Sequence, residues 1–517
     1  MFKSLQSHIR YMLAGLSGVM TGLAFYGSPF SWLEWLALVP LFFAINNTKP
    51  GKALATGLLT GLSTGLVFFL WVFPVASRFM GRASILSFIF YLTLSLFYAA
   101  LPACFSFLFT WYKKVLSDNF IILQHIFVAG GLWIGLEWLH CLVFTGIPCT
   151  LLYPVYSQCP IPALLQPAAV TGGAGISFII VAFNYLIFIA LLRKKAWYVV
   201  TGGIIFALLT GYGVICMKMW HDRPAGTPVK VCILQENIVA EARWNDATAD
   251  SLANIFISLN RQAAAMKPDL ILWSETAIPW TFRPDDDLLN AALQISAPGG
   301  ARHVLGMLTA ATDNAENVYN SAYYIEPDGR VTGITHKVQM LSFVEKPLLD
   351  WSILSKLRMP VYRMGLQKNL LAGKRRSLLR TAFGQAGVII CNETLTGEPA
   401  RDVCGQGATF LLAMSNDAWF LDRNIPRFHF DYTVLRAIEN RRDIAVSSNG
   451  GFAGFIDASG KVVHRRQSRE PQCIYGTIQP RYKLTFYTRY GDVLVYMCLT
   501  ALFGYYIYCG ILKRRQV

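Results

Sequence analysis

Residues 387–398, GVIICNETLTGE, decide the fold class of the middle of this chain. The apolar run GVII leads directly to Cys391 and then to Asn392 and Glu393, which is the pattern of a buried β-strand that ends in a polar turn. Taken alone, a cysteine in this position is more often a packing residue of the core. A thiol at a strand end is also an efficient acyl acceptor once it becomes a thiolate. Other stretches of the chain decide between these two interpretations.

Two further stretches place a charged side chain in a similar context. Residues 270–280, LILWSETAIPW, end an apolar run at Glu275, and residues 333–347, GITHKVQMLSFVEKP, contain Lys337. Each charged residue alone would be interpreted as a solvated surface group. Together, a carboxylate, an ammonium group and a thiol at strand ends are the parts of a cysteine-based acyl-transfer site.

The block that contains these stretches, 228–480, alternates short β-branched runs with polar segments. Helical patterns at 246–266 and 430–442 precede two of the runs. Continuous apolar runs are typical of strands buried on both faces, and their alternation with helices predicts a layered α/β domain. The predicted strands are VKVCILQ, DLILWSE, HVLGML, SAYYIE, AGVIICNE, TFLLAMSND, DIAVSSN and CIYGTI.

The rest of the chain is strongly apolar. Of its 517 residues, 54% are hydrophobic and 15% are charged, and the mean hydropathy is +0.41, which is rare for a soluble protein of this size. A helix needs about 20 apolar residues to cross a bilayer, so we expect a membrane α-helical bundle of about eight helices. The expected spans are 10–27, 30–46, 53–74, 84–111, 120–141, 166–192, 196–216 and 491–512. The expected domains are a seven-span bundle at 1–220, a catalytic α/β domain at 228–482, and a last span with its tail at 488–517.

Lysine and arginine residues at the ends of the spans predict the orientation. They gather in the loops of one side, among them 193–195 and 513–515, whereas the short loops of the other side hold only Arg78 and Arg82. Positive loops mark the cytoplasmic side, so we expect both termini in the cytoplasm. The α/β domain then lies outside, which in a bacterium is the periplasmic face of the inner membrane. Many of the lysine and arginine residues behind the net charge of +16 lie at the ends of spans, where they set the topology. We find no basic run interleaved with aromatics that would indicate a nucleic-acid partner.

The loop at 142–162 has no charged residue, so we expect it to lie in the membrane interface or to pack over the bundle. Glu137 and His140 lie about one helical turn apart, just before this loop. Intramembrane ionisable residues are candidates for function, and the plainer alternative is a Glu–His hydrogen bond that anchors the end of the helix. Cys141, Cys149 and Cys159 lie close together in the sequence here, where an oxidising compartment would permit a disulfide.

The order of the reactive residues, with a WSE segment first, a lysine next and a CNE segment last, resembles the nitrilase superfamily. The membrane spans narrow this resemblance to the apolipoprotein N-acyltransferases, which complete bacterial lipoprotein maturation, and it covers nearly the full length. The other motifs that support this resemblance are TGIP (145–148), YSQ (156–158), Trp244 in RWND, SNDAWF (415–420), RAIENRRDIAVSSNGG (436–451) and YTRYGD (487–492).

The resemblance implies a nitrilase-like αββα sandwich beside the helical bundle. It also implies that Glu275 takes the proton of the Cys391 thiol and returns it to the leaving group. Lys337, helped by the backbone N–H of Asn392, would stabilise the oxyanion of the tetrahedral intermediate. Two further acidic positions of the family would hold the lysine charged and in place, Glu345 and Glu393. Substrate contacts are expected from Trp244, Trp419, Asn416 and Tyr156.

The implied reaction is a ping-pong transfer. Cys391 takes an acyl chain from a phospholipid as a thioester, and the α-amine of a diacylglyceryl-modified N-terminal cysteine of an apolipoprotein then receives it. We expect a monomer that needs neither cofactor nor metal, since the sequence has no metal-ligand spacing and no phosphate loop. The amphipathic segment 348–371 would be a lid over the acyl site or an ordinary surface loop. The first rival function is a membrane-tethered nitrilase-type amidase or hydrolase that uses water as the acceptor. The second is a transporter or lipid-binding protein with an inactive nitrilase domain, which loss of a reactive residue would favour, and all three are present.

The sequence departs from the family pattern at several positions around the reactive residues. The family usually has a histidine two residues after the lysine, followed by Leu, Val, Pro and Phe-Gly-Glu. This chain has Gln339 at the position of the histidine and then Met340, Leu341, Ser342 and Phe343-Val344-Glu345. Asn392 stands where a tyrosine often follows the cysteine, and Cys149 stands where a tryptophan often follows the TGFP motif. The reactive positions themselves are retained.

Overall fold

The computed structural model divides the chain into two compact units, which we describe separately. The helical unit comprises Met1–Ile215 and Tyr490–Val517, and the α/β unit comprises Cys216–Arg489. The structure describes residues 2–79, 84–115, 122–144, 146–147, 151–223, 225–240, 242, 244–312, 314, 316–342, 344–346, 369–420 and 424–515.

Two β-sheets form the centre of the α/β unit. The seven-stranded sheet has the order β13-β1-β2-β3-β4-β5, with β6 paired to β4, and the six-stranded sheet has the order β12-β11-β10-β9-β8-β7. The strands β1, β2 and β3 run parallel to one another, as do β8, β9 and β10. The strands are β1 Val229–Gln235, β2 Leu270–Leu272, β3 Arg302–Ala310, β4 Asn317–Ile325, β5 Val331–His336, β6 Asn369–Leu371, β7 Leu379–Thr381, β8 Gly384–Ile390, β9 Phe410–Asn416, β10 Ile444–Asn449, β11 Ala453–Ile456, β12 Val462–Arg466 and β13 Gln472–Ile478. All eight predicted strands are confirmed.

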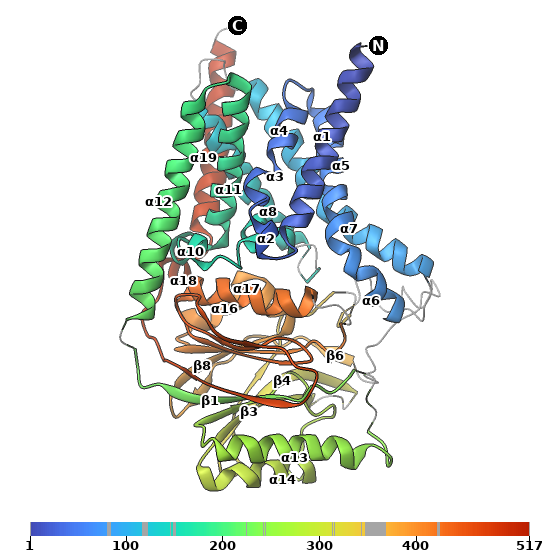
Figure 1. The fold of residues 1–517 in the computed structure, drawn as a ribbon, viewed down its shortest axis with the longest axis vertical. Helices are drawn as coiled ribbons and strands as arrows, with labels where there is room; N and C mark the ends of the chain where they lie inside the picture. Colours follow the sequence, from blue (N-terminus) through green and yellow to red (C-terminus); the bar gives the residue numbers. More distant parts are fainter. Residues whose placement is uncertain are drawn as a thin grey trace. The chain divides into compact units, whose positions relative to one another are not determined.

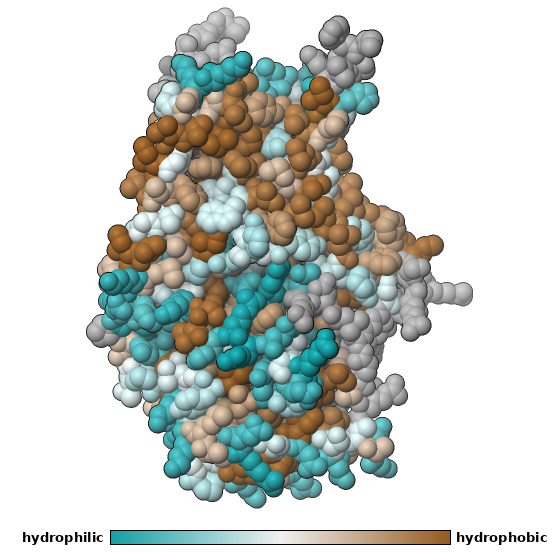
Figure 2. Space-filling model, viewed as in Figure 1, coloured by the Kyte–Doolittle hydropathy of each residue, from teal (hydrophilic) through white to brown (hydrophobic). Residues whose placement is uncertain are grey.

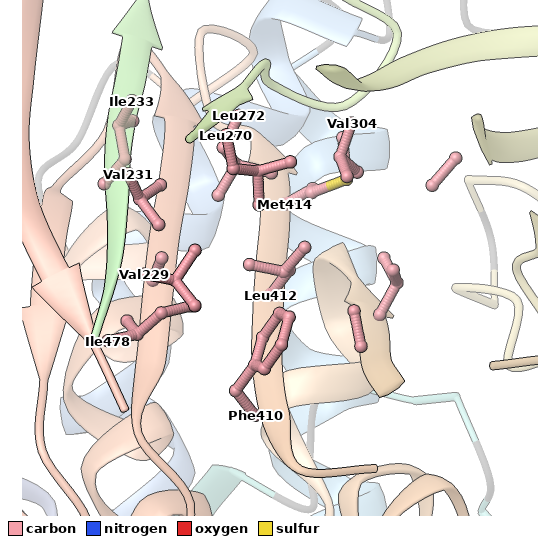
Figure 3. Packing of buried hydrophobic residues seen from close by; sticks show 14 of the residues in the cluster. Val229, Val231, Ile233, Leu270, Leu272, Val304, Phe410, Leu412, Met414 and Ile478 are labelled. Atoms are coloured by element: carbon pink, nitrogen blue, oxygen red, sulfur yellow. The ribbon is translucent and has the colours of Figure 1, made fainter. Parts of the chain in front are cut away.

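The core of this unit lies between the two sheets. Figure 3 shows side chains of both sheets pointing toward one another, with Leu272 and Val304 of one sheet beside Met414 of the other. These side chains are almost completely buried. Burying one such aliphatic side chain contributes about 1.5–3 kcal/mol, which explains why the strands are continuous apolar runs rather than alternating ones.

Helices cover both outer faces of the sheets. α13 (Ala249–Ala265) and α14 (Asp287–Ser296) pack through Phe256 and Leu293 on the outer face of the seven-stranded sheet. α16 (Gly397–Gly405) and α17 (Asn424–Asn440) cover the six-stranded sheet (Figure 1). The predicted αββα sandwich is therefore confirmed, although α17 begins earlier than the helical pattern at 430–442 indicated. Short helical turns complete the unit: η3 Ala297–Gly299, η4 Cys391–Leu395 and α18 Phe486–Tyr490.

The helical unit confirms the predicted membrane class, with a slightly different number of spans. Within the described residues six helical stretches are long and apolar enough to cross a membrane: Ser28–Ile45, Pro50–Ser77, Ile85–Lys113, Ile122–Val143, Ala168–Arg193 and Ala196–His221. The spans expected at 10–27 and 491–512 coincide with helices α1 and α19, of which α19 has a shorter apolar stretch, Val493–Tyr508. The helices are α1 Phe2–Ala24, α2 Ser28–Ser31, α3 Glu34–Ala37, α4 Val39–Ile45, α5 Pro50–Phe68, η1 Phe69–Trp71, α6 Val72–Phe79, α7 Ser84–Val115, α8 Ile122–Val143, α9 Pro154–Ser157, α10 Pro162–Leu165, α11 Ala168–Arg193, α12 Ala196–His221 and α19 Val493–Arg515.

Small residues allow these helices to pack closely. Gly57, Gly61 and Gly65 repeat every fourth residue along α5 and face α7. A Cβ atom added at Gly61 would meet the Ala99 Cα at 2.5 Å, so a larger residue would force the helices apart. On the outer side, apolar side chains stay exposed, as Figure 2 shows on one face and as Leu208 (68% exposed) illustrates on α12. Such a surface is suited to lipid rather than water.

Residues 151–159 of the uncharged loop are buried within the helical unit, whereas Leu142 and Val143 at its start belong to α8 and are exposed. Leu151 and Leu152 are fully buried, as the second of our two expectations for this loop predicted. The Glu137 carboxylate accepts a hydrogen bond from the Trp133 Nε1 at 2.8 Å, and the two His140 ring nitrogens contact the Tyr153 hydroxyl and the Phe97 carbonyl, both at 3.0 Å. These contacts with Trp133, Tyr153 and Phe97 anchor the end of α8. Cys149 lies outside the described residues.

Candidate active site

Glu275 occupies a sharp turn just beyond β2. The turn fits because Gly306 of β3 has no side chain: a Cβ atom there would meet the Ser274 carbonyl oxygen at 2.2 Å. The Glu275 carboxylate is 6% exposed. It accepts a hydrogen bond from the Asn320 side-chain amide at 2.6 Å on Oε1 and from the Asn416 backbone N–H at 2.8 Å on Oε2. The carboxylate is therefore fixed by one donor from each sheet.

Lys337 directly follows β5, and its side chain is completely buried. Its backbone N–H donates to the Asn320 carbonyl at 2.8 Å, which places it beside the residue that holds Glu275. The Nζ atom donates to Glu345 Oε1 at 2.7 Å and to Glu275 Oε1 at 3.5 Å. Burial alone would lower the pKa of Lys337, but the charge of Cys391 in its thiolate form and the negative charges of Glu345 and Glu275 outweigh burial and raise the pKa. Lys337 is thus a permanent cation in the site.

Cys391 directly follows β8 and begins the turn η4. Its φ of +56° is in the left-handed region that non-glycine residues rarely adopt, and such strained residues gather at functional sites. Burial raises the pKa of the Cys391 thiol well above its ordinary value, Glu275 raises it further, and Lys337 opposes both. The resting group is therefore a neutral thiol that needs a base, and Glu275 is close enough for its charge to act on it.

The two further acidic residues have different partners. Glu345 binds the Lys337 ammonium, as predicted, and its other oxygen accepts from the Leu341 N–H at 2.7 Å. Our prediction that Glu393 also holds the lysine is wrong. One Glu393 oxygen accepts from the N–H groups of Val338 and Gln339 and from Arg376 Nε, each at 3.1 Å, so it ties the segment after the lysine to the turn after the cysteine.

Two of the departures from the family pattern contact each other. The Asn392 side-chain amide donates to the Gln339 carbonyl at 3.1 Å, and the Thr396 hydroxyl donates to the Gln339 side chain at 3.1 Å. Asn392 and Gln339 therefore link the segment after Lys337 to the nucleophile turn. The sequence showed both departures but gave no sign that they are neighbours.

Sequence reasoning missed two residues of the site, Asn320 and Arg376. Asn320 binds Glu275, and the 5% exposed Arg376 binds Glu393, Glu398 and Asp402. Asn320 lies in the middle of a strand, and Arg376 lies in a basic run that resembles a solvated surface segment. Only contacts far apart in the sequence reveal them.

The residues predicted to touch substrate are spread over the molecule. Asn416 reaches the site through its backbone, and the half-buried Trp419 lies in the turn three residues later. Trp244 instead packs in the apolar cluster beneath α13, 4.9 Å from the Trp280 ring centroid. Tyr156 belongs to the helical unit, where it is buried. The predicted lid at 348–371 lies outside the described residues except for its end, which forms β6.

The assembled groups have the chemistry that acyl transfer requires. A thiol, a carboxylate and a buried ammonium group provide a nucleophile, a base and an oxyanion partner. Over the described part of the chain, no group of three or more His, Cys, Asp or Glu side chains is placed to hold a metal ion.

Comparisons with known proteins match both units. A family model of the apolipoprotein N-acyltransferase N-terminal domain matches residues 17–186, and a model of carbon-nitrogen hydrolases matches residues 230–485. An apolipoprotein N-acyltransferase of Geobacter metallireducens is 29% identical over 95% of this chain and 93% of its own length. That of Methylococcus capsulatus is 28% identical, over 93% and 92% respectively.

Solved structures resemble the α/β unit at lower similarity. The Caenorhabditis elegans NitFhit protein has 18% identity and a TM-score of 0.39 and covers 53% of this chain and 64% of its own. Saccharomyces cerevisiae Nit3, a member of the nitrilase superfamily, has 15% identity and a TM-score of 0.37 and covers 50% of this chain and 92% of its own.

Proposed function

Because the chain belongs to the apolipoprotein N-acyltransferase family, a membrane-bound branch of the carbon-nitrogen hydrolase superfamily, we propose that it N-acylates lipoproteins. The donor is a membrane phospholipid, and the acceptor is the α-amine of an S-diacylglyceryl-cysteine at the N-terminus of an apolipoprotein. The observation that carries this proposal is the hydrogen-bonded group of Glu275 and Lys337 beside Cys391.

In the first half-reaction Glu275 removes the thiol proton and the Cys391 sulfur attacks the ester carbonyl of the phospholipid. The Lys337 ammonium and the Asn392 backbone N–H stabilise the negative oxygen that develops. The intermediate then breaks its bond to the glycerol oxygen, which leaves with the proton held by Glu275. The products are a lysophospholipid and a thioester on Cys391.

In the second half-reaction the acceptor amine attacks the thioester carbonyl. Glu275 accepts a proton from the amine, and the same oxyanion partners stabilise the second tetrahedral intermediate. When the carbon–sulfur bond breaks, the proton returns to sulfur and the amide leaves. The site thus needs one base and one cation for both steps, which fits its single Glu275–Lys337 pair.

We further propose that the α/β unit is periplasmic and that both termini are cytoplasmic. The support is the asymmetric distribution of lysine and arginine described above. Impermeant thiol reagents should label single cysteines introduced at exposed positions of the α/β unit in intact cells. Labels beside Lys194 should react only after permeabilisation, and the opposite pattern would reverse this topology.

The acceptor is what separates this proposal from a nitrilase-type hydrolase. The test incubates purified full-length protein with acyl-labelled phosphatidylethanolamine, with or without a diacylglyceryl-cysteine peptide, and uses Cys391→Ala as the blank. We expect labelled N-acyl peptide, and little free fatty acid when the peptide is omitted. Release of free fatty acid at one rate, with or without peptide, would favour the hydrolase.

A further inference from the structure

The stretch SNDAWF at 415–420 contains a buried carboxylate that the mechanism above does not use. Asp417 is 1% exposed. Its Oδ2 atom accepts hydrogen bonds from the Ser448 hydroxyl at 2.7 Å and from the Ser415 hydroxyl at 3.1 Å. Its Oδ1 atom contacts the Nδ1 of His429 at 2.7 Å. A buried carboxylate with this many donors is held in one orientation.

His429 connects this carboxylate to α17. The side chain is buried, and its ring meets the Phe420 ring at a centroid distance of 6.4 Å and an angle of 79°. Because an ionised carboxylate can only accept, Nδ1 is the donor toward Asp417. His429 therefore contacts both ends of the turn from Asp417 to Phe420. Within this turn, the Phe420 N–H donates a hydrogen bond to the Asp417 carbonyl at 3.0 Å.

The glycine at the end of SSNGG makes room for this arrangement. A Cβ atom at Gly451 would lie 2.3 Å from both Asp417 Oδ2 and the Ser448 hydroxyl oxygen. Residues 436–451 form another motif that has no part in the mechanism above. The last residues of this motif contact Asp417. The Asp417 N–H also donates to the Asn449 carbonyl at 2.8 Å.

This network is attached directly to the general base. Asn416, which precedes Asp417, donates its backbone N–H to Glu275 Oε2 at 2.8 Å. Its side-chain oxygen accepts from the Asn449 amide at 3.0 Å. Any rotation of the Asp417 turn would therefore move the donor that fixes Glu275. The charge of Asp417 also acts on Cys391.

We propose that Asp417 and His429 form a positioning pair for Glu275. The pair sets the direction of the Asn416 N–H and, through it, the orientation of the carboxylate toward the Cys391 thiol. The inference depends on the proposed function only in taking Glu275 as the base. Its plain alternative is a buried pair that stabilises the fold without affecting the base.

The test measures acylation of Cys391 by p-nitrophenyl butyrate, an ester that requires neither phospholipid nor lipoprotein. The pre-steady-state burst of p-nitrophenolate is recorded against ester concentration for the full-length wild type, His429→Leu and His429→Asn. Asparagine places an amide nitrogen close to the position of Nδ1 and so should keep the bond to Asp417. His303→Leu is the matched control, because His303 is also buried and bonded to two side chains, Trp273 and Ser296.

We expect His429→Leu to lower the maximal acylation rate about 10- to 100-fold, the effect of a small misplacement of a catalytic group, while the half-saturating ester concentration is unchanged. His429→Asn should stay within about threefold of wild type, and His303→Leu should lower the melting temperature without lowering the rate. A wild-type rate in folded His429→Leu would overturn the proposal, as would equal losses in the Leu and Asn variants. If His429→Leu does not fold, Asp417→Asn replaces it with the same expected loss. A normal burst without transfer from phospholipid would contradict only the proposed function.

Discussion

The two turns that carry the base and the nucleophile leave different sheets, yet both pass through a left-handed residue. Thr276, directly after Glu275, has a φ of +45°, and Cys391 has a φ of +56°. They differ in how their reactive groups are held. Glu275 is bound by Asn320 from one sheet and Asn416 from the other, whereas the thiol responds to the charges around it. The difference teaches that the position of the base depends on the packing of the two sheets, while the nucleophile depends on its own strand end.

Replacing the base should have the largest effect. Glu275→Gln keeps the shape and an acceptor for Asn320 but cannot take a proton, so we expect acylation of Cys391 to fall about 10³- to 10⁴-fold, the upper range for general-base catalysis. Single-turnover kinetics with labelled phospholipid measure this. Glu326→Gln is the control, because Glu326 pairs with Arg302 far along the chain from the reactive turns. Acylation by Glu275→Gln at the wild-type rate would remove Glu275 from its role.

Replacing Lys337, the cation that binds both Glu275 and Glu345, should have the next largest effect. Lys337→Met removes the oxyanion partner and leaves Glu345 without its 2.7 Å ion pair, so we expect a loss of about 10²–10³ in the acylation rate. The exposed Lys346 provides the control Lys346→Met. Circular dichroism should establish that the variant is folded before the rates are compared. A folded Lys337→Met with an undiminished rate would mean that another group stabilises the oxyanion.

The raised pKa of the thiol predicts a pH effect on stability. An unfolded cysteine loses its proton near pH 8.5, whereas folded Cys391 keeps it because burial raises its pKa. Above that pH the unfolded state binds fewer protons, so stability falls as pH rises, by at most about 1.4 kcal/mol per pH unit. Thermal unfolding from pH 8 to 10 should show a steeper decline for wild type than for Cys391→Ala. Other buried thiols, such as Cys404, contribute equally to both proteins. If stability declined equally with pH in wild type and Cys391→Ala, the raised pKa of Cys391 would be contradicted.

Relieving the backbone strain beside the base should have the smallest effect. Thr276→Gly removes a β-branched residue from the left-handed region, and we expect stability to rise by about 0.5–1 kcal/mol after the entropy of the more flexible unfolded chain is subtracted. The acylation rate should change less than about threefold, because both donors to Glu275 remain. The matched change Thr332→Gly, in the exposed part of β5, should instead lower stability. A loss of stability in Thr276→Gly would mean that the threonine side chain contributes more than its strain costs.

Eight of the strands and both reactive turns could be predicted from the sequence because their signal is local, whereas β5, β6, β7, β11 and β12 were not predicted. β1 and β9 each contain a continuous apolar run that ends in a polar residue, and each could be predicted without knowledge of its partner. The strand β12 was missed because all five of its residues are exposed, so it has no apolar run. The span expected at 30–46 is divided into three short helices, which its overall hydropathy does not reveal.

The partners of the reactive residues could not be predicted in the same way. Asn320 and Glu275 are 45 residues apart, and Asn416 and Glu275 are 141 apart, so their contacts depend on the register and packing of the sheets. Glu393 was assigned to the lysine because it matches an acidic position of the family, and the resemblance implied that this carboxylate would hold the lysine. The structure shows that Arg376 and three backbone N–H groups, those of Val338, Gln339 and Ile390, bind its carboxylate instead.

Intact-protein mass spectrometry tests the central claim, the thioester on Cys391, most directly. Full-length wild type and Cys391→Ala are incubated with phosphatidylethanolamine of one acyl composition, and the adduct is mapped by peptide analysis. The account predicts a mass increase of one acyl group on the peptide that contains Cys391, loss of that adduct when diacylglyceryl-cysteine peptide is added, and no adduct in Cys391→Ala. An acyl adduct of equal amount in Cys391→Ala, or transfer to the peptide by that variant, would contradict it.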